Sequence, residues 1–193
     1  MKYYVVIDLE WTSWRNNYYG KFLKKEKRKS WQKKEIIQIG AIKFNQKYQI
    51  KKKLNIFVRP AINEKLSKYI VNLTSITDKI LKLKGVKFPV ALDKLRRFTK
   101  GCFVFSNGPD SLILKKNFLY NRINAKEIKI FDVKPILENK YNIPQKFLHS
   151  PMLKSFFGYK INKKKMHNAL YDCQSILFSL KKMNFDFEIF DSA

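Results

Sequence analysis

Short apolar runs bounded by charge mark the first third of the chain. Residues 3–9 (YYVVIDL) have the pattern of a buried strand, and residues 36–44 (IIQIGAIKF) and 54–58 (LNIFV) predict two more. Three predicted strands thus precede the first predicted helix.

From residue 60 onward, helical patterns alternate with further strands. We expect strands at 102–106 and 128–132, helices at about 64–72, 77–84, 89–100, 110–122 and 168–183, a helix opened by Pro135, and short helical pieces around 150–157. Asn107-Gly108-Pro109 predicts a turn. The fold class is therefore α/β: a mixed five-stranded sheet with helices on both faces, in one domain spanning 1–193.

Charge adds a partner class. Lys and Arg number 41 and Asp and Glu 15, so the net charge is +26. Such an excess attracts polyanions, and nucleic acid is the obvious one. The alternative is solvated surface lysine from AT-rich codons, since 35 of the basic residues are Lys. The densest segment, 21–34, has eight basic residues and one acid, and we interpret it as an exposed basic arm; residues 184–193 form a short acidic-aromatic tail.

Several classes are disfavoured. No apolar run approaches the length of a membrane span, and Asp8 and Glu10 stand where a signal peptide would be apolar. Cys102 and Cys173 provide neither a disulfide framework nor a metal-binding spacing. We expect a cytoplasmic protein with no membrane association.

Acids are scarce, so their placement is informative. Asp8 and Glu10 are two residues apart in the first strand, which puts both carboxylates on one face. Buried side by side they would repel each other, and a divalent cation such as Mg²⁺ or Mn²⁺ would remove that repulsion. In the alternative, Leu9 faces the core and both acids face solvent.

Three further residues are weaker signals when taken singly. Asp110 begins a helix after a strand and a turn, where an acid is also a common cap. His167 and Asp172 are five residues apart, so they cannot share a helical face; we expect His167 in the loop that enters the last helix, with Asp172 in its first turn.

In this order, D-x-E, a later Asp and H-x-x-x-x-D resemble the DEDDh 3′→5′ exonucleases of the ribonuclease-H-like superfamily. The resemblance rests on VVIDLEWT (5–12), EIIQIGAIKF (35–44), FSNGPDSLIL (105–114) and HNALYDC (167–173). In addition, FVRPAINEKLSKYIVNLTSIT (57–77) looks like a segment of the histone-mRNA and small-RNA 3′ exonuclease subfamily. One departure bears on it: Gly108-Pro109-Asp110 is one residue shorter than the usual Gly-x-x-Asp. The Tyr variant of the family has its tyrosine at the position of Asn168, so the His variant applies here.

The resemblance implies a reaction and a set of site residues. Asp8, Glu10, Asp110 and Asp172 would hold two Mg²⁺ or Mn²⁺ ions, and His167 would be the general base for the attacking water. Water would attack the terminal phosphodiester at a 3′ end and release a nucleoside 5′-monophosphate. The resemblance favours single-stranded RNA over DNA as substrate.

Other residues are candidates for holding the substrate. Lys163, Lys164 and Lys165 directly precede the histidine, and the arm contributes Lys24, Lys25, Lys27 and Arg28. The resemblance places Trp11 and Thr12 against the terminal nucleotide.

Two other functions remain open. One is a nucleic-acid-binding protein that keeps the fold without catalysis, although all five expected side chains are present. The other is a DNA proofreading subunit held by a polymerase, for which the acidic-aromatic tail is the only candidate docking segment. No obligate protein partner is evident.

Overall fold

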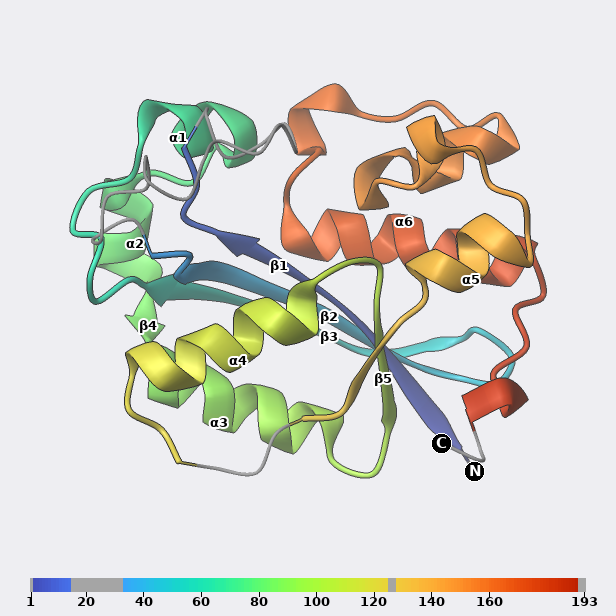
Figure 1. Cartoon of the computed structure of the whole chain (residues 1–193), viewed down its shortest axis with the longest axis horizontal. Helices are drawn as coiled ribbons and strands as arrows, with labels where there is room; N and C mark the ends of the chain where they lie inside the picture. Colours follow the sequence, from blue (N-terminus) through green and yellow to red (C-terminus); the bar gives the residue numbers. More distant parts are fainter. Residues whose placement is uncertain (1, 15–32, 125–127, 191–193) are drawn as a thin grey trace.

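A computed structural model describes residues 2–14, 33–124 and 128–190. Its centre is a mixed sheet of six strands in the order β4-β3-β2-β1-β5-β6 (Figure 1). Strand β1 pairs antiparallel with β2 and parallel with β5, and β2 pairs antiparallel with β3. The strand that carries Asp8 and Glu10 is therefore central.

The strands are β1 (Tyr3–Trp11), β2 (Ile36–Asn45), β3 (Ile50–Arg59), β4 (Val86–Lys87), β5 (Phe103–Ser106) and β6 (Ile130–Asp132). The α-helices are α1 (Lys68–Thr74), α2 (Asp78–Lys84), α3 (Phe88–Thr99), α4 (Asp110–Tyr120), α5 (Lys134–Asn139) and α6 (Ala169–Lys182). Shorter 3₁₀ segments are η3 (Gln145–Phe147), η4 (Ser150–Phe157), η5 (Lys163–Lys165) and η6 (Glu188–Phe190).

Helices cover both faces of the sheet because alternate residues of the central strands are apolar on both sides. Val5, Ile7 and Leu9 pack in one cluster with residues of α3 and α4. Tyr4 and Val6 pack in another with residues of α6. Figure 1 shows the same division, with α3 and α4 on one side of the sheet and α5 and α6 on the other. The predicted mixed sheet with helices on both faces is confirmed.

The sheet has six strands where five were expected. The additional strand, β4, has two residues and pairs parallel with the end of β3. Strand β3 also begins four residues earlier than the apolar run at 54–58, because Lys51, Lys52 and Lys53 are exposed strand residues that no hydrophobic pattern could reveal.

The acidic-aromatic tail packs back on the body as far as the structure describes it. Phe185, Phe187 and Phe190 are buried in the cluster beside α6. The ring of Phe187 stacks on Tyr4 with centroids 4.4 Å apart, and the Tyr48 hydroxyl donates to the Phe185 carbonyl oxygen at 3.1 Å. These rings are thus committed to the fold itself, which removes the observation that favoured a polymerase-held subunit.

Within the described residues, no helix combines the length and apolar character needed to cross a membrane.

Candidate active site

Strand β1 brings two carboxylates to the face of the sheet covered by α6. Asp8 and Glu10 are both buried, and Leu9 between them points to the opposite face, where it packs with the α3 and α4 cluster. Side chains therefore alternate between the two faces of β1 as predicted, but the face that carries the two acids is buried and does not point to solvent. A register shift between Glu10 and Trp11 ends the regular pairing with β2 just past the second acid.

The third acid, Asp110, reaches the same place from the start of α4. Its Oδ1 accepts a hydrogen bond from the backbone N–H of Leu9 at 3.0 Å. Asp110 is 4% exposed. The shorter Gly108-Pro109-Asp110 turn therefore still delivers its carboxylate to the strand that carries the first two.

Strand β2 fixes the entrance of α6 over these acids. Gly40 pairs with Asp8, and a Cβ atom at Gly40 would lie 2.3 Å from the backbone carbon of Ala169. Only glycine permits that approach. The side chain of Gln38, which pairs with Glu10, accepts a hydrogen bond from the Ala169 N–H at 3.1 Å. The first turn of α6 is thereby held directly above β1.

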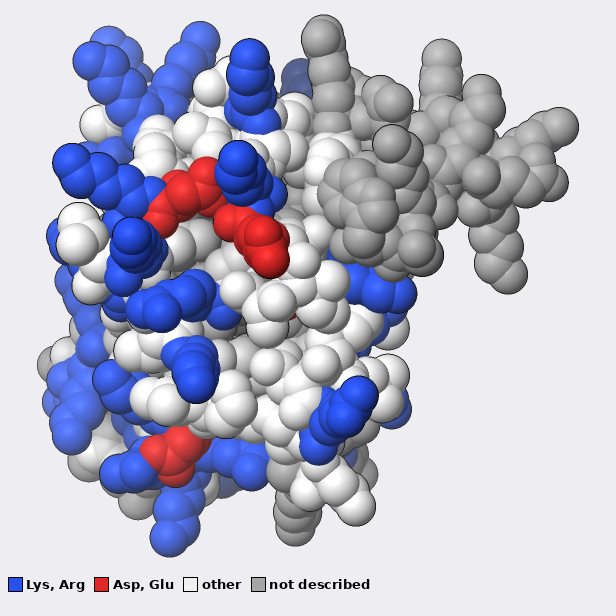
Figure 2. Space-filling view, turned by 90° about the vertical axis from the view of Figure 1, so that its left-hand side faces the viewer, with Lys and Arg blue, Asp and Glu red and all other residues white. Residues whose placement is uncertain are grey.

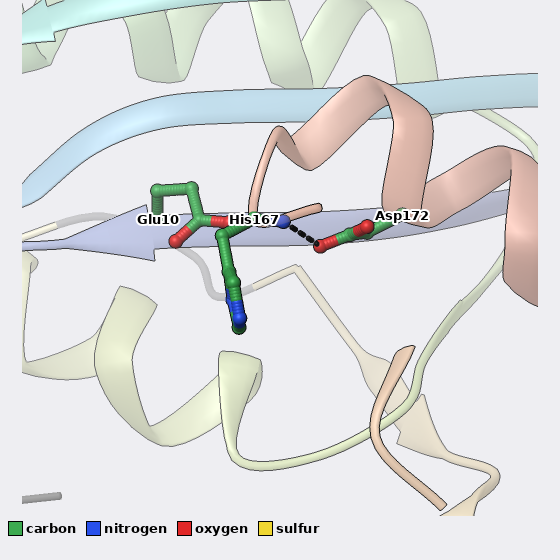
Figure 3. A group of neighbouring side chains, drawn as sticks. All are labelled: Glu10, His167 and Asp172. Carbon is green, nitrogen blue, oxygen red and sulfur yellow. Dashed lines mark hydrogen bonds between the residues drawn. The ribbon is translucent and has the colours of Figure 1, made fainter. Parts of the chain in front are cut away.

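Asp172 lies in that first turn, and His167 lies just before the helix, as the sequence predicts. Asn168 caps the helix, and His167 precedes it with a left-handed backbone at φ 57°. The His167 N–H donates to Asp172 Oδ2 at 3.1 Å (Figure 3). In Figure 3 the imidazole extends away from the ribbons of β1 and α6, while Glu10 and Asp172 lie along β1. Strained backbone is tolerated where the surroundings fix it, often at functional sites.

Glu10, His167 and Asp172 are close enough to share a cation. Each offers one ligand atom, and these atoms all lie within 4.8 Å of one another. Asp8 and Asp110 interact electrostatically with the same carboxylates.

Burial raises the pKa of all four carboxyl groups. The pKa of Asp8 and of Glu10 lies well above the usual value, first because of desolvation and then because of repulsion from Asp172 and Asp110. Desolvation also raises the pKa of Asp110 to about 7 and that of Asp172 to about 8. Asp172 Oδ1 is buried with no hydrogen-bond partner. Four crowded carboxylates with an unused oxygen fit divalent cations, which prefer oxygen ligands and cancel the repulsion.

His167 has the opposite perturbation. Burial, and the nearby His149, lower the pKa of its imidazole below 6.5. The ring is therefore neutral near pH 7 and able to accept a proton.

These side chains surround a cavity of about 340 Å³. On the side of β1 and α6, the cavity is lined by Asp8, Glu10, His167 and Asp172. An apolar wall is formed by Trp11, Ile70 and Leu73. The turn after β5 and the segments that follow contribute Asn107, Lys134, His149 and Ser150. Ser150 hydrogen-bonds the Asp8 carboxyl group.

Sequence reasoning missed this last group, as well as Gln38 and Gly40. Gln38 and Gly40 interrupt the apolar run 36–42, and this was a readable signal for the second pair. His149 and Ser150 lie at the start of the 3₁₀ segment η4, where no periodic pattern gives such a signal.

The predicted substrate-binding residues are placed differently from one another. Trp11 lines the cavity. Thr12 is buried, and its hydroxyl donates to the Lys33 carbonyl oxygen at 2.6 Å and accepts from the Glu35 N–H at 2.9 Å. Lys163, Lys164 and Lys165 are exposed and are not among the residues that line the cavity. Lys24, Lys25, Lys27 and Arg28 lie outside the described residues. Substrate contact by any of these remains a prediction.

Basic side chains are also distributed over the surface. Figure 2 faces the side that carries α1 and α2, and it shows Lys and Arg over much of that face, around a few acidic side chains. Lys68, Lys79, Lys82 and Lys84 of these two helices are exposed. A polyanion would meet attractive charge on this face.

A mixed sheet of this topology, with a buried carboxylate cluster and a neutral histidine at its central strand, defines a nuclease of the ribonuclease-H-like class. The profile of the exonuclease family RNase_T matches residues 5–178, and the chain belongs to this family. The resemblance to the DEDDh exonucleases is confirmed, and this family implies divalent metal ions.

Solved structures share the fold. One is a 3′-exonuclease described in 3′-end recognition of the histone mRNA stem-loop, with a TM-score of 0.77 and 22% identity over 94% of this chain and 81% of that one. Another is the nuclease domain of the DEDDh family member 3′hExo bound to rAMP, with a TM-score of 0.77 and 22% identity over 94% and 91%. E. coli exonuclease I bound to single-stranded DNA has a TM-score of 0.71 and 13% identity over 100% of this chain and 42% of that one. No curated protein sequence matches the chain.

Proposed function

We propose that this protein is a metal-dependent 3′→5′ exonuclease that removes nucleoside 5′-monophosphates from single-stranded 3′ ends, with RNA preferred over DNA. The observation that carries the proposal is that Asp8, Glu10, Asp172 and His167 line one cavity, with Asp110 held beside them by its bond to the Leu9 N–H. A protein that only bound nucleic acid would have no use for four buried acids, which repel a phosphate backbone.

Asp8, Glu10, Asp110 and Asp172 would hold two Mg²⁺ or Mn²⁺ ions. When bound, such ions activate water, polarise the phosphate and stabilise the leaving oxygen. The raised carboxyl pKa values indicate that the site lacks the positive charge it needs to ionise fully.

His167 would accept the proton of the attacking water. Its ring projects away from α6 at the cavity wall, and its lowered pKa keeps it neutral at physiological pH. The bond from its own N–H to Asp172 fixes the backbone that carries the ring, so the base and a carboxylate are positioned by one contact.

The cavity is of the size and chemistry for one terminal nucleotide. Trp11, Ile70 and Leu73 offer an apolar wall for a base, whereas the acids lie on the β1 and α6 side. A base stacked on an aromatic side chain contributes about 1–3 kcal/mol. A compact cavity for a terminal residue favours attack at an end over attack within a strand.

The preference for RNA is supported by the resemblance of segment 57–77 to an RNA 3′ exonuclease subfamily, and by the structural likeness to a histone-mRNA 3′-exonuclease. Because the fold is also similar to that of an exonuclease bound to single-stranded DNA, the test includes DNA as a second substrate.

The test is a degradation assay on 3′-labelled single-stranded RNA, single-stranded DNA and stem-loop RNA, each with Mg²⁺, Mn²⁺ or EDTA. We expect release of labelled mononucleotide, fastest from single-stranded RNA, with none in EDTA. Asp8→Asn serves as the inactive control. Equal turnover in EDTA would show that the reaction needs no metal ion. Faster turnover of DNA than of RNA would contradict the proposed preference for RNA.

A further inference from the structure

A second histidine and a lysine line the cavity together with the predicted catalytic residues and take no part in the reaction described above. Lys134 is the first residue of α5, and His149 directly precedes η4. Both line the same cavity as Asp8 and His167.

Lys134, His149 and His167 line one cavity. Lys134 contributes to lowering the pKa of His149, after burial, and His149 in turn contributes to lowering that of His167. Such effects fall off steeply with distance near a protein surface. Lys134 therefore lies near His149, and His149 lies near the predicted base.

The backbone around His149 is anchored on both sides. Leu148 and Ser150 are buried, and the Asn107 side-chain amide donates to the Leu148 carbonyl oxygen at 2.8 Å and to Ser150 Oγ at 3.3 Å. Ser150 in turn hydrogen-bonds Asp8. His149 is thus held at a fixed place relative to the carboxylates, with its ring partly buried at the cavity.

Lys134 is anchored to the same turn. Its backbone N–H donates to Asp132 Oδ1 at 2.9 Å, and the Gly108 N–H donates to the same oxygen at 2.9 Å. The turn at 107–108 therefore positions both segments, and it also leads into the helix that begins with Asp110.

The cavity has two chemically different walls. Trp11, Ile70 and Leu73 supply apolar surface, whereas Lys134 and His149 supply N–H donors and positive charge. A nucleotide has the same division, with an apolar base face at one end and an anionic phosphate at the other. A phosphate brought among four carboxylates needs donors as well as metal ions, because anions repel at this range.

We propose that Lys134 and His149 form a phosphate subsite that holds the non-bridging oxygens of the terminal nucleotide's phosphate, which is the scissile phosphate before hydrolysis and the product phosphate after it. This inference rests on the proposed function and adds the residues that orient the substrate in the cavity. Lys134 provides an ammonium group and His149 a ring N–H, so neither needs to gain or lose a proton.

The test compares binding of adenosine 5′-monophosphate with that of adenosine, by calorimetry in Mg²⁺, where neither compound can be hydrolysed by the exonuclease reaction. The variants are Lys134→Met and His149→Leu, which remove the donors and keep side-chain bulk. Lys134→Arg is the conservative variant. Lys146→Gln is the control, because Lys146 is exposed in the neighbouring η3 and does not line the cavity.

We expect each of the two donor-removing variants to bind the monophosphate roughly 10- to 100-fold more weakly, the range expected when a hydrogen bond to a charged group is lost. Adenosine binding should not change, Lys134→Arg should retain monophosphate binding, and Lys146→Gln should match the wild type. Unchanged monophosphate affinity in both variants would overturn the subsite, and so would an equal loss for monophosphate and adenosine.

Steady-state kinetics on a short RNA gives a second measurement. Loss of a contact made in both ground and transition states raises KM and leaves kcat nearly unchanged. A fall in kcat with unchanged KM would contradict a binding role. If the wild type discriminates monophosphate from adenosine through this pair but degrades no nucleic acid, the subsite stands and the exonuclease proposal fails; if it degrades RNA and the variants behave as wild type, only the subsite fails.

Discussion

The backbone N–H of Leu9 donates to the carboxylate of Asp110 at 3.0 Å, although the two residues are 101 positions apart in the sequence. This bond ties the start of α4 to the middle of β1, between the two acids of the strand. It brings the acid at the start of α4 next to the two acids of β1, so that the three carboxylates form one cluster.

Removing one charge from this cluster should abolish activity without unfolding the protein. Asp110→Asn keeps an oxygen that accepts from Leu9, and Asp8→Asn and Asp172→Asn likewise preserve shape. We expect loss of nearly all exonuclease activity in each variant. In EDTA each should unfold at a higher temperature than the wild type, because carboxylate repulsion is relieved. Near wild-type turnover in Mg²⁺ for any of the three would show that its carboxylate is dispensable.

The same repulsion predicts how the stability of the metal-free protein depends on pH. The pKa of Asp110 is raised to about 7 and that of Asp172 to about 8, whereas both ionise near 3.8 when unfolded. Between these values the folded protein binds more protons than the unfolded chain, so the free energy of unfolding falls as pH rises from about 4 to about 8. Thermal melts in EDTA across this range should show the fall, and Mn²⁺ should flatten it. A melting temperature in EDTA that rises from pH 5 to pH 8 would contradict this ionisation behaviour.

His167 should behave as a base and not as a principal metal ligand. We expect His167→Ala to lower the rate by roughly 10²–10⁴-fold. Because burial and His149 lower the pKa of His167, the acid limb of the wild-type pH–rate profile should lie below pH 6.5. Calorimetric titration with Mn²⁺ separates the two roles: affinity should be nearly unchanged in His167→Ala, and a large loss would assign His167 to the metal.

The close contact at Gly40 provides a test of positioning. In Gly40→Ala the added Cβ would lie 2.3 Å from the Ala169 carbonyl carbon, so the start of α6 must shift. We expect a lower melting temperature and a loss of activity larger than the fraction unfolded explains. Wild-type activity in a folded Gly40→Ala protein would mean that α6 can move without disturbing His167 and Asp172.

Much of this arrangement could be predicted from the sequence. The period of two in β1 placed Asp8 and Glu10 on one face, and the five-residue spacing placed His167 in the loop before the last helix with Asp172 in its first turn. The depth of burial could not be predicted, because it depends on α6 and on the segment at 148–150, which are joined to β1 only through long-range contacts. Helix and strand ends shifted by a few residues for a similar reason: Ser67, whose hydroxyl accepts from the Ile70 N–H, caps α1 at a point that no periodicity marks.

The basic arm at 21–34 yields a prediction from sequence alone. If Lys24, Lys25, Lys27 and Arg28 bind phosphates just upstream of the 3′ end, changing all four to Ser should weaken binding to a long single-stranded RNA. The slope of log K against log salt should flatten by about 2–3, at about 0.7 per contact. Turnover of saturating short substrates should barely change.

The matched control for the arm replaces four exposed lysines on β3 and at α3, Lys51, Lys53, Lys94 and Lys100, with Ser. It removes the same charge from a described surface. An arm variant whose salt slope equals that of the wild type, or an equal flattening in the control, would contradict a specific role for the arm.

The central claim is hydrolysis from a 3′ end by this cluster, and one time course tests it most directly. Single-stranded RNA labelled at its 3′ terminus, the same strand labelled at its 5′ terminus, and a circular form of it are each incubated with the wild-type protein in Mg²⁺. We predict that the 3′ label appears first as nucleoside 5′-monophosphate, that the 5′-labelled strand shortens as a ladder, and that the circle stays intact. Early release of the 5′ label as mononucleotide, or cleavage of the circle, would contradict the account.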